Sequence, residues 1–82
     1  MPGIDKGKRF YRVRQVNPNK IKPKTFRMKI LSLAKGIRAI GGISKDTGKW
    51  TIQTLLFDID KWTPAKIRAW VKQHGFRIMG GG

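Results

Sequence analysis

The first clear alternation of apolar and polar positions begins after residue 25 and predicts a strand. Phe26, Met28 and Ile30 alternate with Arg27 and Lys29. A period of two is typical of a strand with one buried face and one basic face. A helix is the competing interpretation, because methionine, lysine and leucine favour it. We expect a strand whose three apolar side chains point into the core.

A β-hairpin is predicted next along the chain. Two β-rich runs flank the sequence KDTG at residues 45–48. Within such a sequence an aspartate can turn the chain through its side chain, and a glycine can take a positive φ. Folding about this turn would bring Ile43 near Trp50 and Ile37 near Leu56.

The glycine pair Gly41-Gly42 interrupts the first run of this hairpin. Glycines weaken the interior of a strand, and they often mark a β-bulge or a place where another backbone comes close. A glycine pair before a basic turn could also let a phosphate approach. We favour the bulge, because no helix follows directly whose dipole would attract a phosphate.

Local chemistry at both ends predicts a helix over about residues 64–74. Thr63 has the hydroxyl of an N-cap, and Pro64 suits the first helical position. Gly75 can adopt the left-handed conformation that ends a helix, and Phe76 can then fold back on the last turn. Both ends of the helix are therefore specified by nearby residues.

The apolar side of this helix predicts how the domain packs. Ile67, Trp70 and Val71 share one side, and the basic residues look outward. We predict an α+β fold, with a small antiparallel sheet of three to four strands and one helix packed on one face. Residues 76–79 could add a final short strand. The inward face of the sheet is expected to carry Phe26, Met28, Ile30, Ile37, Trp50, Ile52 and Leu56.

The N-terminal residues 1–25 are predicted to form a basic, partly flexible arm, because prolines and glycines punctuate them. Within the arm, residues 9–16 could form a short edge strand. We expect disorder before about Lys8. A single α+β domain would then occupy residues 26–79, and residues 80–82 would form a disordered tail.

The charge balance gives the strongest indication of the class of partner. Lysine and arginine total 19 against 4 acidic residues, which gives a formal net charge of +15. An excess of this size indicates a polyanionic partner, because counterions released from it supply binding free energy. We predict nucleic-acid binding through phosphates, with DNA, and duplex DNA in particular, favoured over RNA. We expect the phosphate contacts to come from the face of the sheet that the helix leaves open and from the N-terminal arm. The residues are Arg9, Arg12, Arg14, Lys20, Lys22, Lys24, Arg27, Lys29 and Arg38, of which Arg12, Arg14, Arg27, Lys29 and Arg38 would lie on the sheet and Lys20, Lys22 and Lys24 on the arm. The expected base-stacking residues are Tyr11 and Trp50.

Enzymatic chemistry is not indicated. The chain has no cysteine and one histidine, His74, and it lacks a nucleophile with a base, a carboxylate dyad and a P-loop. Asp58 and Asp60 could ligate a metal, but we expect them to solvate a turn. We predict no enzyme activity, no cofactor and no metal.

Location follows from what the sequence lacks. Neither a run of about 18 apolar residues nor a signal peptide is present. A membrane partner is therefore not expected, and we predict a place in the interior of the cell.

A motif spans residues 57–75, and its members are Phe57, Asp58, Lys61, Trp62, Thr63, Ala69, Trp70, His74 and Gly75. This pattern, FD..KWT.....AW...HG, resembles a segment of tailed-phage head-morphogenesis proteins, especially prohead-protease-like and related prophage proteins. The resemblance covers roughly residues 26–76, and it departs at Pro64 and Ile67. Because no catalytic histidine and serine of a protease are matched, the resemblance implies a viral or prophage origin and not proteolysis. With that origin, the expected location is the cytoplasm of the host cell or the virion.

Three other interpretations stay open. The chain could be a protein-interaction module of a phage particle or a host-takeover system, whose basic surface meets an acidic protein. It could instead bind RNA, because a basic sheet with exposed aromatic residues can hold single strands. The charge could also be no more than a solvated surface.

Overall fold

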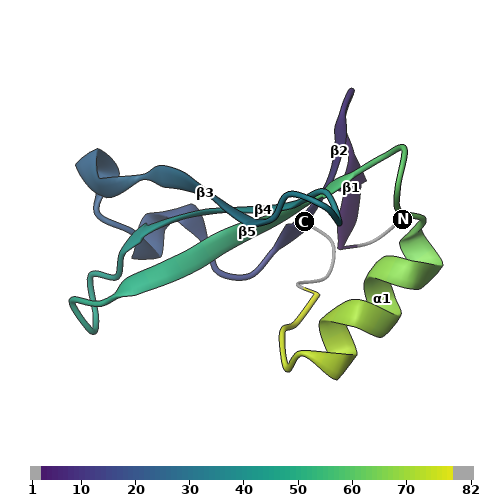
Figure 1. The fold of residues 1–82 in the computed structure, drawn as a ribbon. Helices are drawn as coiled ribbons and strands as arrows, with labels where there is room; N and C mark the ends of the chain where they lie inside the picture. The colour runs from purple at the N-terminus through teal and green to yellow at the C-terminus, as the bar shows by residue number, and fades with distance from the viewer. Residues whose placement is uncertain (1–2, 79–82) are drawn as a thin grey trace.

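Two long strands, β4 (Ile37–Ile43) and β5 (Trp50–Asp58), form an antiparallel hairpin at the centre of a five-stranded sheet. The computed structural model describes residues 3–78. Figure 1 shows the strands and the side on which the helix lies. The order across the sheet is β1-β2-β5-β4-β3. The outer strands are β1 (Ile4–Lys6), β2 (Phe10–Arg14) and β3 (Arg27–Ser32).

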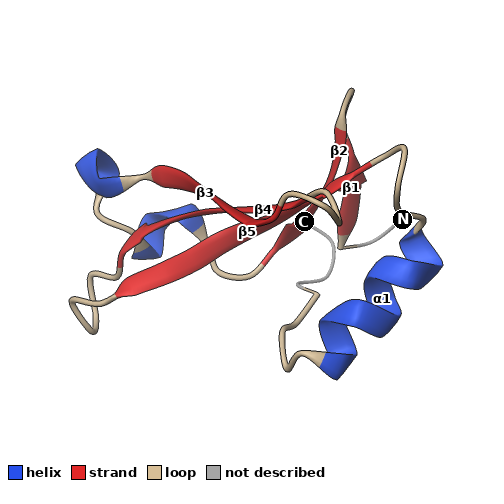
Figure 2. Cartoon of the chain, in the orientation of Figure 1, coloured by secondary structure: helices blue, strands red, loops and turns tan. Residues whose placement is uncertain are grey.

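The α-helix α1 (Pro64–Gln73) lies on one side of the sheet (Figure 2). The predicted α+β class is therefore confirmed, with five strands in place of three or four. Both additional strands come from the N-terminal residues. No helix formed by residues 3–78 is long and apolar enough to cross a membrane.

The strand order forces the chain to cross the sheet between β2 and β3, which lie on opposite sides of the central hairpin. We call residues 17–26 the crossing segment; it contains two short 3-10 turns, η1 (Pro18–Lys20) and η2 (Pro23–Thr25). Ile21 bridges to Ser44 at the end of β4. The crossing segment is thus attached to the central hairpin along its path.

The predicted hairpin is confirmed, with a shift in register. Ile43 pairs with Trp50 as expected, whereas Ile37 pairs with Phe57 and not with Leu56. The difference of one residue arises from a bulge, because the pairing shifts between Ile40 and its neighbour Gly41.

Gly41 and Gly42 permit close packing on both faces of β4. A Cβ on Gly42 would lie 2.5 Å from Cγ2 of Ile21, which belongs to the crossing segment. A Cβ on Gly41 would lie 2.8 Å from a ring carbon of Trp50, on the other face. Both expectations for the glycine pair, a bulge and a close approach, are confirmed.

The predicted helix ends are also confirmed. Thr63 Oγ1 accepts a hydrogen bond from the Lys66 backbone N–H at 3.3 Å, and a proline follows the cap. Gly75 has a φ of 74°, and the Phe76 N–H donates to the Val71 carbonyl at 3.0 Å. This last bond is the return contact of a Schellman ending.

An aromatic cluster fixes α1 to the sheet. Phe57 is fully buried and makes edge-to-face contacts with Trp62 and Trp70, with ring centroids 5.0 and 5.4 Å apart. Trp70 also stacks on His74 and Phe76. The aromatic residues of the 57–75 motif are therefore packing residues. The buried core comprises Ile4, Val13, Ile37, Ala39, Leu55, Phe57, Ile67 and Val71.

The expectation that the apolar residues of β3 point into the core is wrong. Phe26, Met28 and Ile30 are 38%, 53% and 56% exposed. The register gives the reason: Lys29, and not its apolar neighbours, pairs with the core residue Ala39. Since β3 is an edge strand beyond the reach of α1, neither of its faces is covered.

The other residues expected on the inward face of the sheet do not all lie on the same side of it. Ile37 belongs to the core, and Trp50 and Ile52 pack against it. Leu56 is buried, but it pairs with Arg38 on the opposite side of the sheet from the core.

The expectation of a partly flexible N-terminal arm is wrong for the residues described. β1 and β2 are strands of the sheet, although disorder was expected before residue 8, and β2 lies inside the sheet and not at its edge. Residues 76–78 form no strand. The expected tail at residues 80–82, together with Met79, lies outside the described residues.

A buried glutamine joins the two ends of the fold. The Gln15 side chain donates through Nε2 to the Arg77 carbonyl at 2.6 Å, and its Oε1 accepts from the Arg77 N–H at 3.0 Å. This side-chain amide satisfies the backbone as a neighbouring strand would. It therefore holds residues 76–78 against the sheet.

We expect Gln15→Ala to lower the free energy of unfolding by about 1–3 kcal/mol, because two partly buried hydrogen bonds to the Arg77 backbone are lost. Gln73→Ala, a change of the same type at an exposed helix position, is the control and should have little effect. Urea unfolding measures both variants, and hydrogen exchange should show the Arg77 amide losing protection in Gln15→Ala alone. Equal stability of the two variants would contradict the role given to Gln15.

Candidate nucleic-acid interface

The side of the sheet opposite α1, which we call the open face, carries three arginines. Val13 lies in the core beneath α1, so its neighbours Arg12 and Arg14 point to the other side. Leu56 pairs with Arg12 on one flank and with Arg38 on the other, and residues paired across strands share a face. Three of the predicted phosphate-binding residues are therefore brought together.

An aromatic ring lies among the guanidinium groups of the open face. Cζ of Arg38 lies 5.2 Å from the centroid of the Phe10 ring, and Cζ of Arg9 lies 6.0 Å from it. These distances are in the range of cation–π contacts. A guanidinium stacked on a ring still presents N–H donors in its own plane, where phosphate oxygens can accept them.

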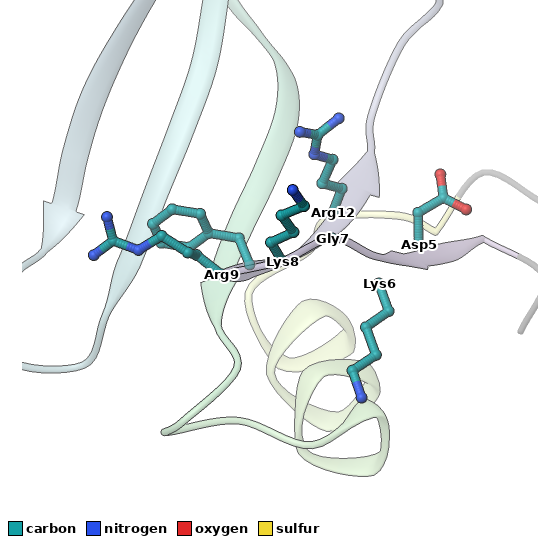
Figure 3. A pocket seen from close by; sticks show the side chains of 7 residues that line it. Asp5, Lys6, Gly7, Lys8, Arg9 and Arg12 are labelled. Atoms are coloured by element: carbon teal, nitrogen blue, oxygen red, sulfur yellow. The ribbon is translucent and has the colours of Figure 1, made fainter.

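The β1–β2 turn forms a basic hollow of about 550 Å³ next to these arginines. Lys8, Arg9 and Arg12 line it, and Asp5 is the single carboxylate in the lining. Figure 3 shows Lys8 and Arg12 standing on the same side of the ribbon, away from the helix, whereas Lys6 points to the helix side. The hollow could receive an anionic group.

The crossing segment borders the open face. A second hollow, of about 270 Å³, is lined by Arg12, Arg14 and the segment's Pro18, together with Asp5, Ile40, Gln53 and Thr54. The arginines thus lie in a groove with the crossing segment as one wall.

Lys20, Lys22 and Lys24 are exposed on the crossing segment, but the flexible arm expected for them is not found. Their backbone is fixed: the Lys22 N–H donates to the Ile43 carbonyl at 2.9 Å, and Ile21 is buried. Lys20 Nζ lies 3.8 Å from Asp46, an exposed pair that contributes little to stability. The three lysines therefore have fixed attachment points at the border of the open face.

Arg27 and Lys29 do not contribute to the open face, contrary to expectation. They alternate with Met28, so they point toward the α1 side of the sheet. Lys29 Nζ lies 4.1 Å from the centroid of the Trp50 ring. Both side chains are exposed, because the core does not cover this part of β3.

Neither expected base-stacking residue lies on the open face. Trp50 packs against the core, Lys29 covers its ring, and its buried Nε1 has no hydrogen-bond partner among residues 3–78. Tyr11 pairs with Phe57 and also packs against the core. The open face instead presents Phe10, which the sequence analysis did not select.

Phe10 and Lys8 are the two residues that sequence reasoning missed. A signal for Phe10 was present, because Phe10, Arg12 and Arg14 occur at every second position of one strand and so share a face. No local signal placed Lys8, since its position depends on the turn between β1 and β2.

Basic side chains are not confined to the open face. Lys66 and Lys72 are exposed on α1, and Lys6 lies on the helix side of β1. What distinguishes the open face is a set of neighbouring arginines that border a groove and an aromatic ring.

The acidic residues considered as metal ligands form a turn. Asp58 Oδ1 accepts a hydrogen bond from the Asp60 N–H at 2.9 Å. Within residues 3–78 there is no group of three or more histidine, cysteine, aspartate or glutamate residues that could hold a metal ion.

Comparison with protein-family models, with curated proteins and with solved structures finds no match.

We expect salt to stabilise the protein, because the net charge of +15 repels itself in the folded state. Moderate NaCl should raise stability on the order of 1 kcal/mol, which corresponds to about 4–8 °C in melting temperature for a domain of this size. Thermal unfolding followed by circular dichroism at several NaCl concentrations measures this.

Two sets of charge-neutralising variants show which surface contributes most to this charge repulsion. Neutralising the open face with Arg12→Gln, Arg14→Gln and Arg38→Gln should reduce the salt effect more than Lys6→Gln, Lys66→Gln and Lys72→Gln, because the arginines lie closer together. A melting temperature independent of salt in the unchanged protein would contradict the expectation.

Proposed function

We propose that the protein binds nucleic acid, with duplex DNA as the favoured form, through phosphate contacts on the open face. The observation that carries the proposal is the placement of Arg12, Arg14 and Arg38 on one side of the sheet, where Arg12 and Arg14 also line a groove. Arginines in this arrangement can each donate two hydrogen bonds to a phosphate.

Lysine side chains at the border of the open face add further groups that can bind phosphate. Lys8 stands beside Arg12 at one end, and Lys20, Lys22 and Lys24 lie on the crossing segment. Because that segment is held by the hairpin, binding would order little additional backbone, and the cost in conformational entropy is small.

The aromatic residues favour a duplex over a single strand. Single-strand binding draws on rings on which bases can stack. Trp50 and Tyr11 pack against the core, and the Phe10 ring is in contact with the guanidinium groups of Arg9 and Arg38. Contacts to the sugar–phosphate backbone are what this surface offers, and a duplex presents such a backbone on both strands.

The origin of the protein is a separate proposal. The resemblance of the 57–75 motif to phage head-morphogenesis proteins suggests a viral or prophage protein, acting in the host cell or in the virion. This suggestion rests on the sequence motif alone, whose aromatic residues are packing residues in this fold.

Titration of a short fluorescein-labelled DNA duplex at several NaCl concentrations tests the function. We expect log K to fall linearly with log salt, with a slope of about −0.9 for each phosphate neutralised. Arg12→Gln, Arg14→Gln and Arg38→Gln should each weaken binding and reduce the slope by about one phosphate.

Lys66→Gln on the outer side of α1 is the control, because it removes the same charge away from the open face. If it weakens binding as much as the arginine variants, the open face is not the interface. Tighter binding of single-stranded DNA or RNA at the same salt would overturn the preference for a duplex.

A further inference from the structure

The large exposed apolar residues of the described chain gather on and beside one edge strand. Met28, Ile30 and Leu31 of β3 are 53%, 56% and 44% exposed. Phe26 before the strand is 38% exposed, and Leu33 after it is 71% exposed. On a protein with so many charged residues, a contiguous exposed apolar stretch marks a candidate interaction site.

β3 also has an unpaired edge. Among residues 3–78 it pairs with β4 alone and lies at the end of the sheet. Backbone N–H and C=O groups therefore point outward along its free side. Such an edge can accept one more strand through main-chain hydrogen bonds, while alternate side chains set the specificity.

The two faces of β3 have different chemistry. Met28 and Ile30 lie on the open-face side, where Met28 Sδ is 3.9 Å from Arg38 Nη1. Arg27 and Lys29 lie on the α1 side, and Lys29 stacks on Trp50. An incoming strand would thus meet apolar side chains on one face and cations on the other.

A second copy of this chain does not fit this edge well. In two antiparallel β3 strands related by a two-fold axis, an axis at Met28 would place Arg27 of one copy opposite Lys29 of the other, and an axis at Lys29 would place the two Lys29 residues opposite each other. Like charges directly opposite each other destabilise a strand pair. The formal net charge of +15 on each copy adds long-range repulsion.

We propose that β3 binds an extended acidic segment of a partner protein as a sixth strand of the sheet. The matching segment alternates acidic and apolar residues, so that its carboxylates face Arg27 and Lys29 while its apolar side chains cover Met28 and Ile30. The charges that keep two copies apart attract this partner. The site goes beyond nucleic-acid binding and does not depend on it.

The probe is a fluorescein-labelled peptide of alternating glutamate and valine, titrated with the full chain and followed by anisotropy. We expect saturable binding that weakens with salt. A peptide of the same composition, with its glutamates in one block and its valines in another, should bind at least about tenfold more weakly, a difference of about 1.4 kcal/mol. Equal binding of the two peptides would show attraction by net charge alone and would overturn the proposal.

Variants locate the binding site. Met28→Thr with Ile30→Thr should weaken peptide binding at least about tenfold, equivalent to about 1.4 kcal/mol, and both positions are exposed, so the fold should persist. Leu33→Thr is the matched control, because Leu33 is more exposed but lies beyond the last residue of β3. Arg27→Gln with Lys29→Gln should also weaken binding, against Lys66→Gln with Lys72→Gln as a charge-matched control.

Hydrogen exchange measured by NMR distinguishes strand addition from other modes of peptide binding. Bound peptide should protect every second amide of β3, those that point away from β4. Protection confined to the open-face arginines, or sedimentation showing that the free protein already pairs through β3, would overturn the proposal. Loss of DNA binding in the open-face arginine variants, with peptide binding retained, is the result expected if the two sites are independent.

Discussion

The close approach at Gly41 and Gly42 is the contact on which the arrangement of this protein depends. The strand order requires residues 17–26 to pass over the central hairpin, and Ile21 can pack there because Gly42 has no side chain. On the other face, Gly41 leaves room for the Trp50 ring. Two adjacent residues without a Cβ therefore let one strand be packed tightly from both sides. The same packing places the lysines of the crossing segment at the border of the open face.

Local features were predictable from the sequence, and long-range pairings were not. The caps of α1, the β4–β5 turn and the bulge each depend on residues close together in the chain, so their chemistry specifies them. A short strand within residues 9–16 was anticipated, but β1 and the interior position of β2 were not, because β2 owes its position to β5, more than 40 residues later; Phe10 pairs with Asp58. The alternation in β3 was detected, but the face that it buries was assigned wrongly. An edge strand that extends beyond the helix can show a period of two without covering either face.

In the candidate interface, too, the chemistry of the residues was predictable and their long-range arrangement was not. Arg12, Arg14 and Arg38 could be selected as cations from composition, but their common face follows only from the pairing of β2 and β4 with β5. The assignment of Arg27 and Lys29 to that face failed because the direction of β3 side chains depends on its register with β4. Trp50 was expected to be available for stacking, and the glycine opposite its ring is what allows it to pack instead. Sequence therefore indicated the chemistry of the surface, whereas topology decided which residues share it.

The pairing of β2 with β5 has a consequence for how the chain acquires its structure. On a ribosome, β1 and β2 emerge well before the strand that separates them from β4. A loop of this length must close before β2 gains its central partner, and non-local pairings of this kind slow folding. The β4–β5 hairpin, with its short turn, is the contact that can form first. Until it does, the arginine-rich N-terminal strands stay accessible to any polyanion nearby.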